Sequence, residues 1–227
     1  MLGFFKFKHY WLLLCAQIFL LIIAVFMTHH IVLTVLFTLA LLGVFGSVIQ
    51  QIWTSSLARI LALISGGIAG GSLFLHLVPH PTFREIEISL IICCLAYALF
   101  ILIAIFAIAK HVFITDRVTI DRLVGSICLY LLIGMFFAFI YGAIYIGAPE
   151  TFYIQWRNPN EELLGLRDFL YFSYITISTI GYGDMLPVHP ASRMLACIEG
   201  MVGPIYLAIV VARLVGMHIT QGREKRG

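Results

Sequence analysis

The sequence predicts an all-α membrane protein with six transmembrane helices. Of its 227 residues, 62% are hydrophobic and only 11% are charged, whereas charged residues make up about 25% of a typical soluble domain. Apolar runs of about 20 residues, long enough to cross a bilayer as helices, recur along the chain. The expected spans are Tyr10–Thr28, Ile31–Trp53, Leu57–Val78, Ile88–Ala109, Leu123–Gly147 and Met194–His218.

The basic residues fall mainly on one side of these expected spans. With the N-terminus inside, ten Lys and Arg residues lie in inner segments and four in outer segments. This follows the positive-inside rule and predicts that both termini are cytoplasmic. The net charge of +3 is modest and does not indicate nucleic-acid binding. The inner set is Lys6, Lys8, Arg59, Lys110, Arg117, Arg122, Arg213, Arg223, Lys225 and Arg226, and the outer set is Arg84, Arg157, Arg167 and Arg193.

The first four expected helices form one membrane block, residues 1–110. The third contains two glycine pairs at a spacing of four, within residues 65–72, and such pairs favour close helix packing. An unwound segment that lines a transporter's substrate site is the alternative. Outer histidines near this block are read as interfacial, with a proton or zinc sensor as the alternative. They are His29, His30, His76 and His80.

The fourth expected helix lacks the charges that a moving voltage sensor requires. It has no basic residue before Lys110. A linker that mixes charged and apolar residues, 111–122, follows it, and we expect this linker to lie along the inner membrane surface. The linker separates the four-helix block from residues 123–218, and a short basic tail, 219–227, ends the chain.

A glycine motif, Thr-Ile-Gly-Tyr-Gly-Asp at 179–184, follows an aromatic segment that is compatible with a short helix, Asp168–Ser178. Gly181 and Gly183 can adopt left-handed backbone angles without steric cost. We expect Tyr182 to point outward and Asp184 to accept hydrogen bonds. The aromatic residues expected to lie against Tyr182 are Phe169, Tyr171, Phe172 and Tyr174.

A helix, a short re-entrant helix, a glycine strand and a second helix resemble the pore unit of the potassium channel family. In that family, rings of backbone carbonyls from four loops replace the water around a potassium ion. The resemblance covers about Asp121–His218 and adds a re-entrant pore helix and a selectivity-filter loop to the expected fold. It implies that carbonyls of Thr179, Ile180, Gly181 and Tyr182 coordinate potassium and that Gly183 completes the filter. Residues expected to support the filter are Asp184, Tyr171, Phe172 and Glu199.

The chain also resembles bacterial six-helix potassium channels without a charged voltage sensor, through residues 118–122 and 206–214. This resemblance implies a homotetramer in the lipid of the bacterial inner membrane. It implies passive, potassium-selective flux, no enzymatic activity, and no cofactor besides the permeant potassium ions. Two other functions stay open: the membrane subunit of a potassium uptake transporter, and a weakly selective cation channel.

The last expected helix carries the residues that would line the inner pore. Gly203 matches the family's glycine hinge, and the adjacent Pro204, a departure from the pattern, favours a kink. Arg213 is expected to point towards lipid headgroups or the linker. For Glu199, an acid within the membrane, we favour a structural role behind the filter over attraction of ions into a cavity. The expected pore-lining stripe, with plain helix packing as the alternative, is Gly203, Leu207, Val211 and Val215.

Overall fold

The computed structural model describes residues 9–25, 40–41, 43–44, 46–48, 60, 67, 83–114, 119–155 and 164–224. The second and third expected helices are therefore described at only a few positions. The paired glycines of 65–72, apart from Gly67, and the four outer histidines lie outside the described residues.

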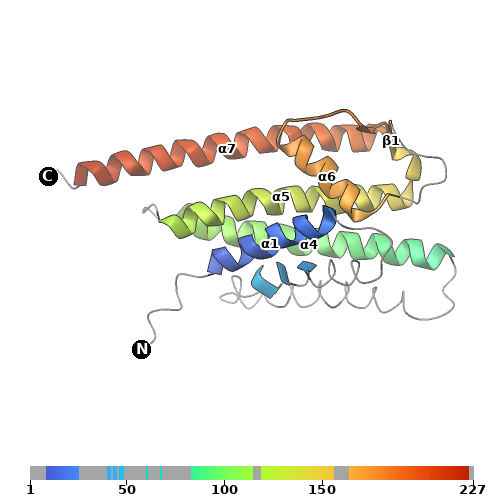
Figure 1. The fold of residues 1–227 in the computed structure, drawn as a ribbon, viewed down its shortest axis with the longest axis horizontal. Helices are drawn as coiled ribbons and strands as arrows, with labels where there is room; N and C mark the ends of the chain where they lie inside the picture. The colour runs from blue at the N-terminus through green and yellow to red at the C-terminus, as the bar shows by residue number, and fades with distance from the viewer. Residues whose placement is uncertain are drawn as a thin grey trace. The chain divides into compact units, whose positions relative to one another are not determined.

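The described elements are mostly helical, and they keep the order expected from the sequence (Figure 1). Stretches long and apolar enough to cross a membrane are Glu87–Phe113, Ile120–Gly147 and Pro190–Arg213, and a shorter apolar helix spans Tyr10–Ala24. The chain is thus a helical membrane protein. The elements are α1 (His9–Val25), α4 (Phe83–Ile114), α5 (Ile120–Gly147), η1 (Pro149–Thr151), β1 (Phe152–Ile154), α6 (Leu166–Ile177), β2 (Met185–Pro187) and α7 (Pro190–Glu224).

All three long helices extend beyond their expected ends, α5 by beginning at Ile120 rather than Leu123. Helix α4 continues from the expected end at Ala109 to Ile114 and so includes the first residues of the expected linker. Val112 is buried in this extension. Packing therefore carries the helix past the end that hydropathy alone predicts. Helix α7 begins at Pro190, a residue that the first turn of a helix accommodates because no N–H donor is needed there.

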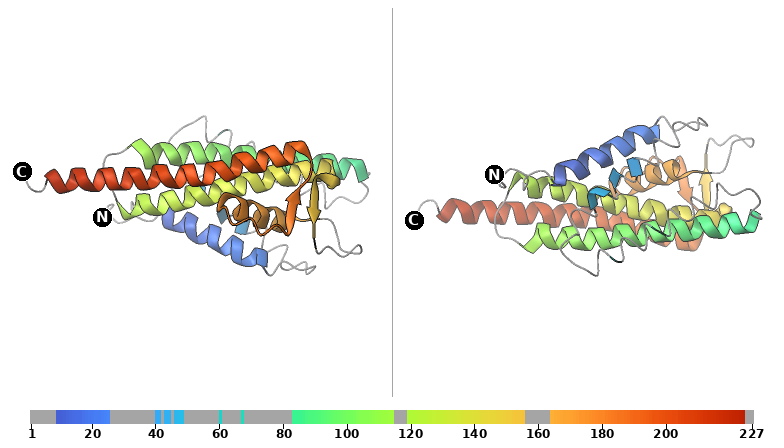
Figure 2. Two further views of the ribbon diagram at one scale, coloured as in Figure 1. Left: turned by 90° about the horizontal axis from the view of Figure 1, so that it is seen from above. Right: turned by 90° about the horizontal axis from the view of Figure 1, so that it is seen from below.

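A small β-sheet is the element that the all-α prediction missed. Strands β1 and β2 pair antiparallel, with Phe152 opposite Pro187 and Ile154 opposite Met185 (Figure 2). Beyond the strand ends, Gln155 N–H donates to the Asp184 carbonyl and Val188 N–H to the Thr151 carbonyl, each at 2.9 Å. Strands of three residues are too short to show an alternating pattern. The sheet joins the segment before α6 to the segment after the glycine motif.

The chain divides into two compact units, and the first contains residues 1–59, 103–132 and 205–227. Within it, hydrogen bonds from side chains to the backbone join α1 to the first half of α5. Gln17 Nε2 donates to the Cys128 carbonyl at 3.2 Å, and Cys128 Sγ donates to the Tyr10 carbonyl at 3.5 Å. Each bond gives a side-chain donor an acceptor that lipid cannot supply.

The C-terminal half of α7 contacts the ends of α4 and α5 within the same unit. The Tyr206 hydroxyl donates to the Ser126 carbonyl at 2.7 Å, and its ring lies 6.5 Å from that of Phe113, edge-on. The Arg213 guanidinium carbon lies 5.2 Å from the centroid of the same Phe113 ring, within reach of a cation–π attraction. Phe113 belongs to the expected linker, which is one of the two surroundings predicted for Arg213.

The second unit, residues 60–102 and 133–204, holds α6 against the second half of α5. The Ser173 hydroxyl donates to the Gly134 carbonyl at 2.6 Å, and a Cβ added to Gly134 would lie 2.6 Å from Tyr174 Cε1. Only a glycine at this position lets the Tyr174 ring come so close to α5. Small residues allow such approaches between membrane helices.

We predict that Gly134→Ala destabilises the protein and that Gly142→Ala does not. An added methyl at Gly142 meets its nearest neighbour, Phe169 Cδ2, at 3.7 Å, an ordinary contact. Overpacking costs about 1–3 kcal/mol, which exceeds the gain of about 1 kcal/mol from replacing a helical glycine by alanine. Thermal unfolding of both purified variants in detergent measures the difference. Equal melting temperatures would show that Tyr174 does not require a glycine beneath it.

Candidate functional site

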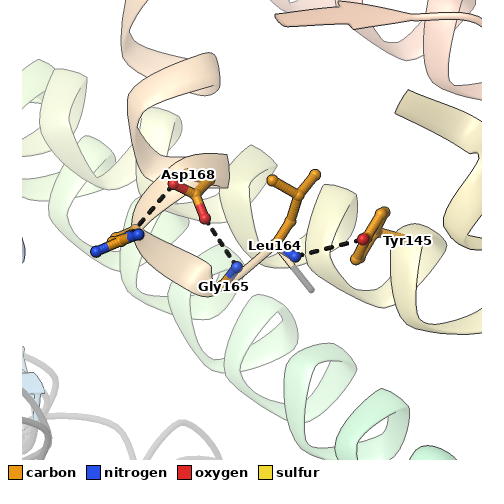
Figure 3. Close-up of polar contacts among 5 residues, drawn as sticks. Tyr145, Leu164, Gly165 and Asp168 are labelled. Carbon is orange, nitrogen blue, oxygen red and sulfur yellow. Dashed lines mark hydrogen bonds and ion pairs between the residues drawn. The ribbon is translucent and has the colours of Figure 1, made fainter. Parts of the chain in front are cut away.

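Helix α6 is fixed at its N-terminus by local polar contacts. The Asp168 carboxylate accepts a hydrogen bond from Gly165 N–H at 2.9 Å and lies 3.4 Å from Arg167 Nε (Figure 3). Leu164 N–H donates to the Tyr145 hydroxyl of α5 at 3.3 Å. An acidic residue in the first turn complements the partial positive charge of a helix N-terminus. These contacts determine where α6 begins.

At the other end of α6, one carbonyl holds the start of the glycine motif. Ile180 N–H and Gly181 N–H both donate to the Ile175 carbonyl, at 2.9 and 3.1 Å. The described chain contains no cis peptide bond, and in a trans peptide the N–H and C=O groups point in opposite directions. The carbonyls of Thr179 and Ile180 belong to these same peptide groups, so they point away from the Ile175 carbonyl.

Backbone angles alternate in sign along the glycine motif. Thr179, Gly181 and Gly183 have φ values of 60°, 53° and 79°. An alternation of negative and positive φ is the pattern that turns successive N–H groups to one side of a chain, as the N–H groups of Ile180 and Gly181 are turned here. In a β-branched residue such as Thr179 a positive φ is an outlier that costs about 1–2 kcal/mol. Such strain is found mostly at functional sites.

At the end of the motif, Asp184 is anchored to α6. The Tyr171 hydroxyl donates to Asp184 Oδ2 at 2.6 Å, and Met185 N–H donates to Oδ1 at 3.1 Å. The bond to Asp184 holds the phenol proton and raises the pKa of Tyr171 to about 12. The hydroxyl therefore stays a donor throughout the physiological pH range.

The aromatic residues expected to lie against Tyr182 divide between two faces of α6 in the single chain, and their packing against Tyr182 stays a prediction. Tyr182 is 70% exposed. Phe169 and Phe172, three residues apart and so on one helix face, are buried against Tyr141, Tyr145 and Phe152. Tyr171 points from another face towards Asp184. If Phe172 supports the motif, it does so by fixing the position of α6.

Glu199 lies within the second unit and connects three helices. It is 0% exposed. Its Oε2 accepts a hydrogen bond from the Tyr141 hydroxyl of α5 at 2.7 Å, and its Oε1 lies in hydrogen-bond contact with Ser173 Oγ of α6. Sequence reasoning singled out Glu199 but missed Tyr141, Ser173 and Gly134, because nothing local in the chain marks a residue that pairs with an acid tens of positions away.

Gly203 permits direct contact between α7 and the end of α6. A Cβ added there would lie 2.0 Å from the Ile177 carbonyl oxygen and 3.0 Å from its carbon. The glycine is therefore required for close approach, whatever hinge motion it also allows. Pro204 lies inside the continuous α7, and the kink stays a prediction. Leu207, Val211 and Val215 are exposed in the chain, and their lining of a pore likewise stays a prediction.

Comparisons with known proteins identify the family. A family model described as "Ion channel" matches residues 125–219, which include α6, the glycine motif, Glu199 and Gly203. Protein LctB of Bacillus caldotenax is 32% identical over 102 residues, which cover 44% of this chain and 75% of that protein. A voltage-gated potassium channel of Aeropyrum pernix is 28% identical over 102 residues. The chain belongs to the potassium channel family.

The channel matches its other relatives over a smaller part of their length. The similarity spans 30% of the Aeropyrum pernix channel. A protein of Oryza sativa subsp. japonica, two pore potassium channel a, is 33% identical over 94 residues, which cover 41% of this chain and 23% of that protein. No solved structure matches the channel.

We predict that Gly203→Ala abolishes the channel's current and that Gly216→Ala preserves it. At Gly203 the new methyl would displace the last carbonyl of α6, whereas a Cβ at Gly216 meets nothing within 4 Å. Both changes raise helix propensity by the same amount, so propensity cannot explain a difference between them. Currents in planar bilayers give the comparison. A normal current from Gly203→Ala would mean that the α6–α7 contact is not needed for conduction.

Proposed function

We propose that the chain is one subunit of a potassium-selective channel whose filter is formed by residues 179–183. The observation that carries the proposal is the backbone of this segment, where φ is positive at Thr179, Gly181 and Gly183. Together with the two N–H groups bonded to Ile175, it supports a row of carbonyls on one side. Carbonyls of Thr179, Ile180, Gly181 and Tyr182 would replace water around potassium.

The functional unit that we propose is a homotetramer in a lipid membrane. One carbonyl row cannot surround an ion, whereas four rows around an axis can. Exposure within the single chain supports this assembly: Ile180 is 55% and Tyr182 70% exposed. Residues on α7 such as Met201 and Ile205 are exposed and apolar, so they suit contact with other copies or with lipid.

In this assembly, α7 would line the inner part of the ion path. A kink at Gly203–Pro204 would direct Leu207, Val211 and Val215 towards the axis. The C-terminal end of α6 carries partial negative charge and would stabilise a cation below the filter. The distribution of basic residues supports an orientation with both termini in the cytoplasm, which we propose for a bacterial inner membrane.

We predict that the reversal potential follows the potassium gradient and that Gly181→Ala removes this selectivity. At Gly181, where φ is +53°, a side chain meets nothing within 4 Å in the single chain, so alanine there strains the backbone by about 1–3 kcal/mol. Gly46→Ala, equally free of contacts, is the control. The measurement is reversal potential in potassium and sodium gradients. Equal permeability of the unmodified channel to both ions would overturn the proposed function.

We also propose that α4 does not gate the channel as a voltage sensor. Each elementary charge that crosses 100 mV contributes about 2.3 kcal/mol, and sensors move about 3–4 charges per subunit. The apolar span Glu87–Phe113 carries Glu87 at one end and Lys110 at the other, with only uncharged side chains between them. The division into a four-helix block, residues 1–110, and a pore domain, 123–218, is part of this proposal.

We predict that no gating current accompanies a voltage step when the pore is blocked. Lys110→Gln is the informative variant, because Lys110 is the one lysine or arginine within the apolar span Glu87–Phe113. The variant should open with the same voltage dependence as the unmodified channel. Charge movement of about 3–4 elementary charges per subunit would refute the proposal, and its disappearance in Lys110→Gln would assign the moving charge.

A further inference from the structure

The cluster around Glu199 has a hydrogen-bond geometry that the proposed function does not explain. Three side chains, Tyr141, Ser173 and Glu199, are each 0% exposed. Ser173 Oγ lies 2.6 Å from the Gly134 carbonyl oxygen and also contacts Glu199 Oε1. The Tyr141 hydroxyl lies 2.7 Å from Glu199 Oε2. All four residues belong to the second unit.

The number of protons in this cluster depends on the charge of Glu199. A serine hydroxyl has one proton to donate, yet Ser173 Oγ contacts two oxygens that are both acceptors if Glu199 is ionised. If Glu199 is a neutral acid, its O–H donates to Ser173 Oγ, and Ser173 in turn donates to the Gly134 carbonyl. Tyr141 then donates to the remaining oxygen of Glu199. Only with the neutral acid does each of the three contacts have a proton of its own.

Burial of Glu199 among uncharged groups also favours the neutral form. From α5 it meets the Tyr141 hydroxyl. From α6 it meets Ser173, with Tyr174 close enough to interact electrostatically. On α7 itself, Cys197 lies near Tyr141. The described groups that act on Glu199 are the Ser173 and Tyr141 hydroxyls, and no described cation is among them. A buried carboxylate without a cation is costly.

We propose that Glu199 is held as a neutral carboxylic acid whose proton positions α6 and, through α6, the proposed filter. The inference rests on the proposed function for the identity of the filter. The connection is short. Glu199 fixes Ser173, and two residues further along α6 the Ile175 carbonyl accepts the N–H groups of Ile180 and Gly181. On α7, Gly203 lies one turn beyond Glu199 and contacts the Ile177 carbonyl.

Loss of this proton would disturb the filter without any change in the ion path itself. Ser173 would then have one proton for two acceptors, and the link either to Gly134 or to Glu199 would break. Helix α6 would lose its attachment to α5 or to α7 near the end that carries the filter. Glu199 is therefore a positioning residue, and alkaline conditions should reduce conduction.

The first test compares Glu199→Gln with Glu199→Ala. A glutamine amide donates to Ser173 and accepts from Tyr141, so it reproduces the neutral acid but cannot lose a proton. We expect Glu199→Gln to keep potassium-selective current that stays constant from about pH 6 to about pH 9. The unmodified channel should lose current as the pH rises. Glu199→Ala should lower the current about tenfold or more at every pH, since buried partners lose their bonds.

The second test detects the proton directly. Infrared spectra of the unmodified channel in lipid should contain the carbonyl band of a protonated carboxylic acid at neutral pH. The band should be absent in Glu199→Gln and should persist in Glu150→Gln, a change at an exposed acid. This signal does not depend on conduction, so it tests the inference even if the channel is not selective for potassium.

Two results would overturn the inference. One is the absence of the Glu199-dependent infrared band at neutral pH, which would mean that the acid is ionised. The other is the same alkaline loss of current in Glu199→Gln as in the unmodified channel, because another group would then be responsible. If instead the band is present but the unmodified channel passes sodium and potassium equally, the proposed function fails and the neutral acid stands.

Discussion

The position of α6 is the constraint on which the rest of the candidate site depends. The Ile175 carbonyl, two residues before the end of this helix, accepts the N–H groups of both Ile180 and Gly181. These two bonds orient peptide groups whose carbonyls then point the other way. A shift of α6 would rotate them, because the segment that follows has strained backbone angles at Thr179 and depends on external contacts to hold them. Helix α6 must therefore be fixed at both ends.

Close approach and polar contacts fix α6 together. Gly134 lets Tyr174 lie against α5, and Gly203 lets α7 touch the Ile177 carbonyl. Glycines are effective at such points because apolar side chains gain little by association in lipid, so packing depends on small residues that bring helices together. The Ser173 and Glu199 contacts add direction to this packing, because hydrogen bonds weaken steeply when their geometry changes.

A second attachment lies at the end of the glycine motif. Asp184 accepts a hydrogen bond from Tyr171, and its own carbonyl accepts one from Gln155 at the end of β1. The strand pair β1–β2 thus holds the segment that leaves the motif, while α6 holds the segment that enters it. A short stretch of strained backbone is fixed on both sides, which suits a site where backbone carbonyls rather than side chains would bind the ion.

The sequence alone determined the features that depend on local composition. Membrane-crossing helices are predicted by apolar runs long enough to span a bilayer. The glycines of the motif predict left-handed backbone angles, which glycine adopts without steric cost. Tertiary structure decided the rest, because it depends on residues far apart in the chain. The partners of Glu199 lie 26 and 58 positions away, the pairing of β1 with β2 joins segments too short to predict, and α5 covers Phe169 and Phe172. Gly203 appears in the sequence as a hinge, but only the packed helices show that it has to be a contact, since the atom that excludes a side chain belongs to Ile177.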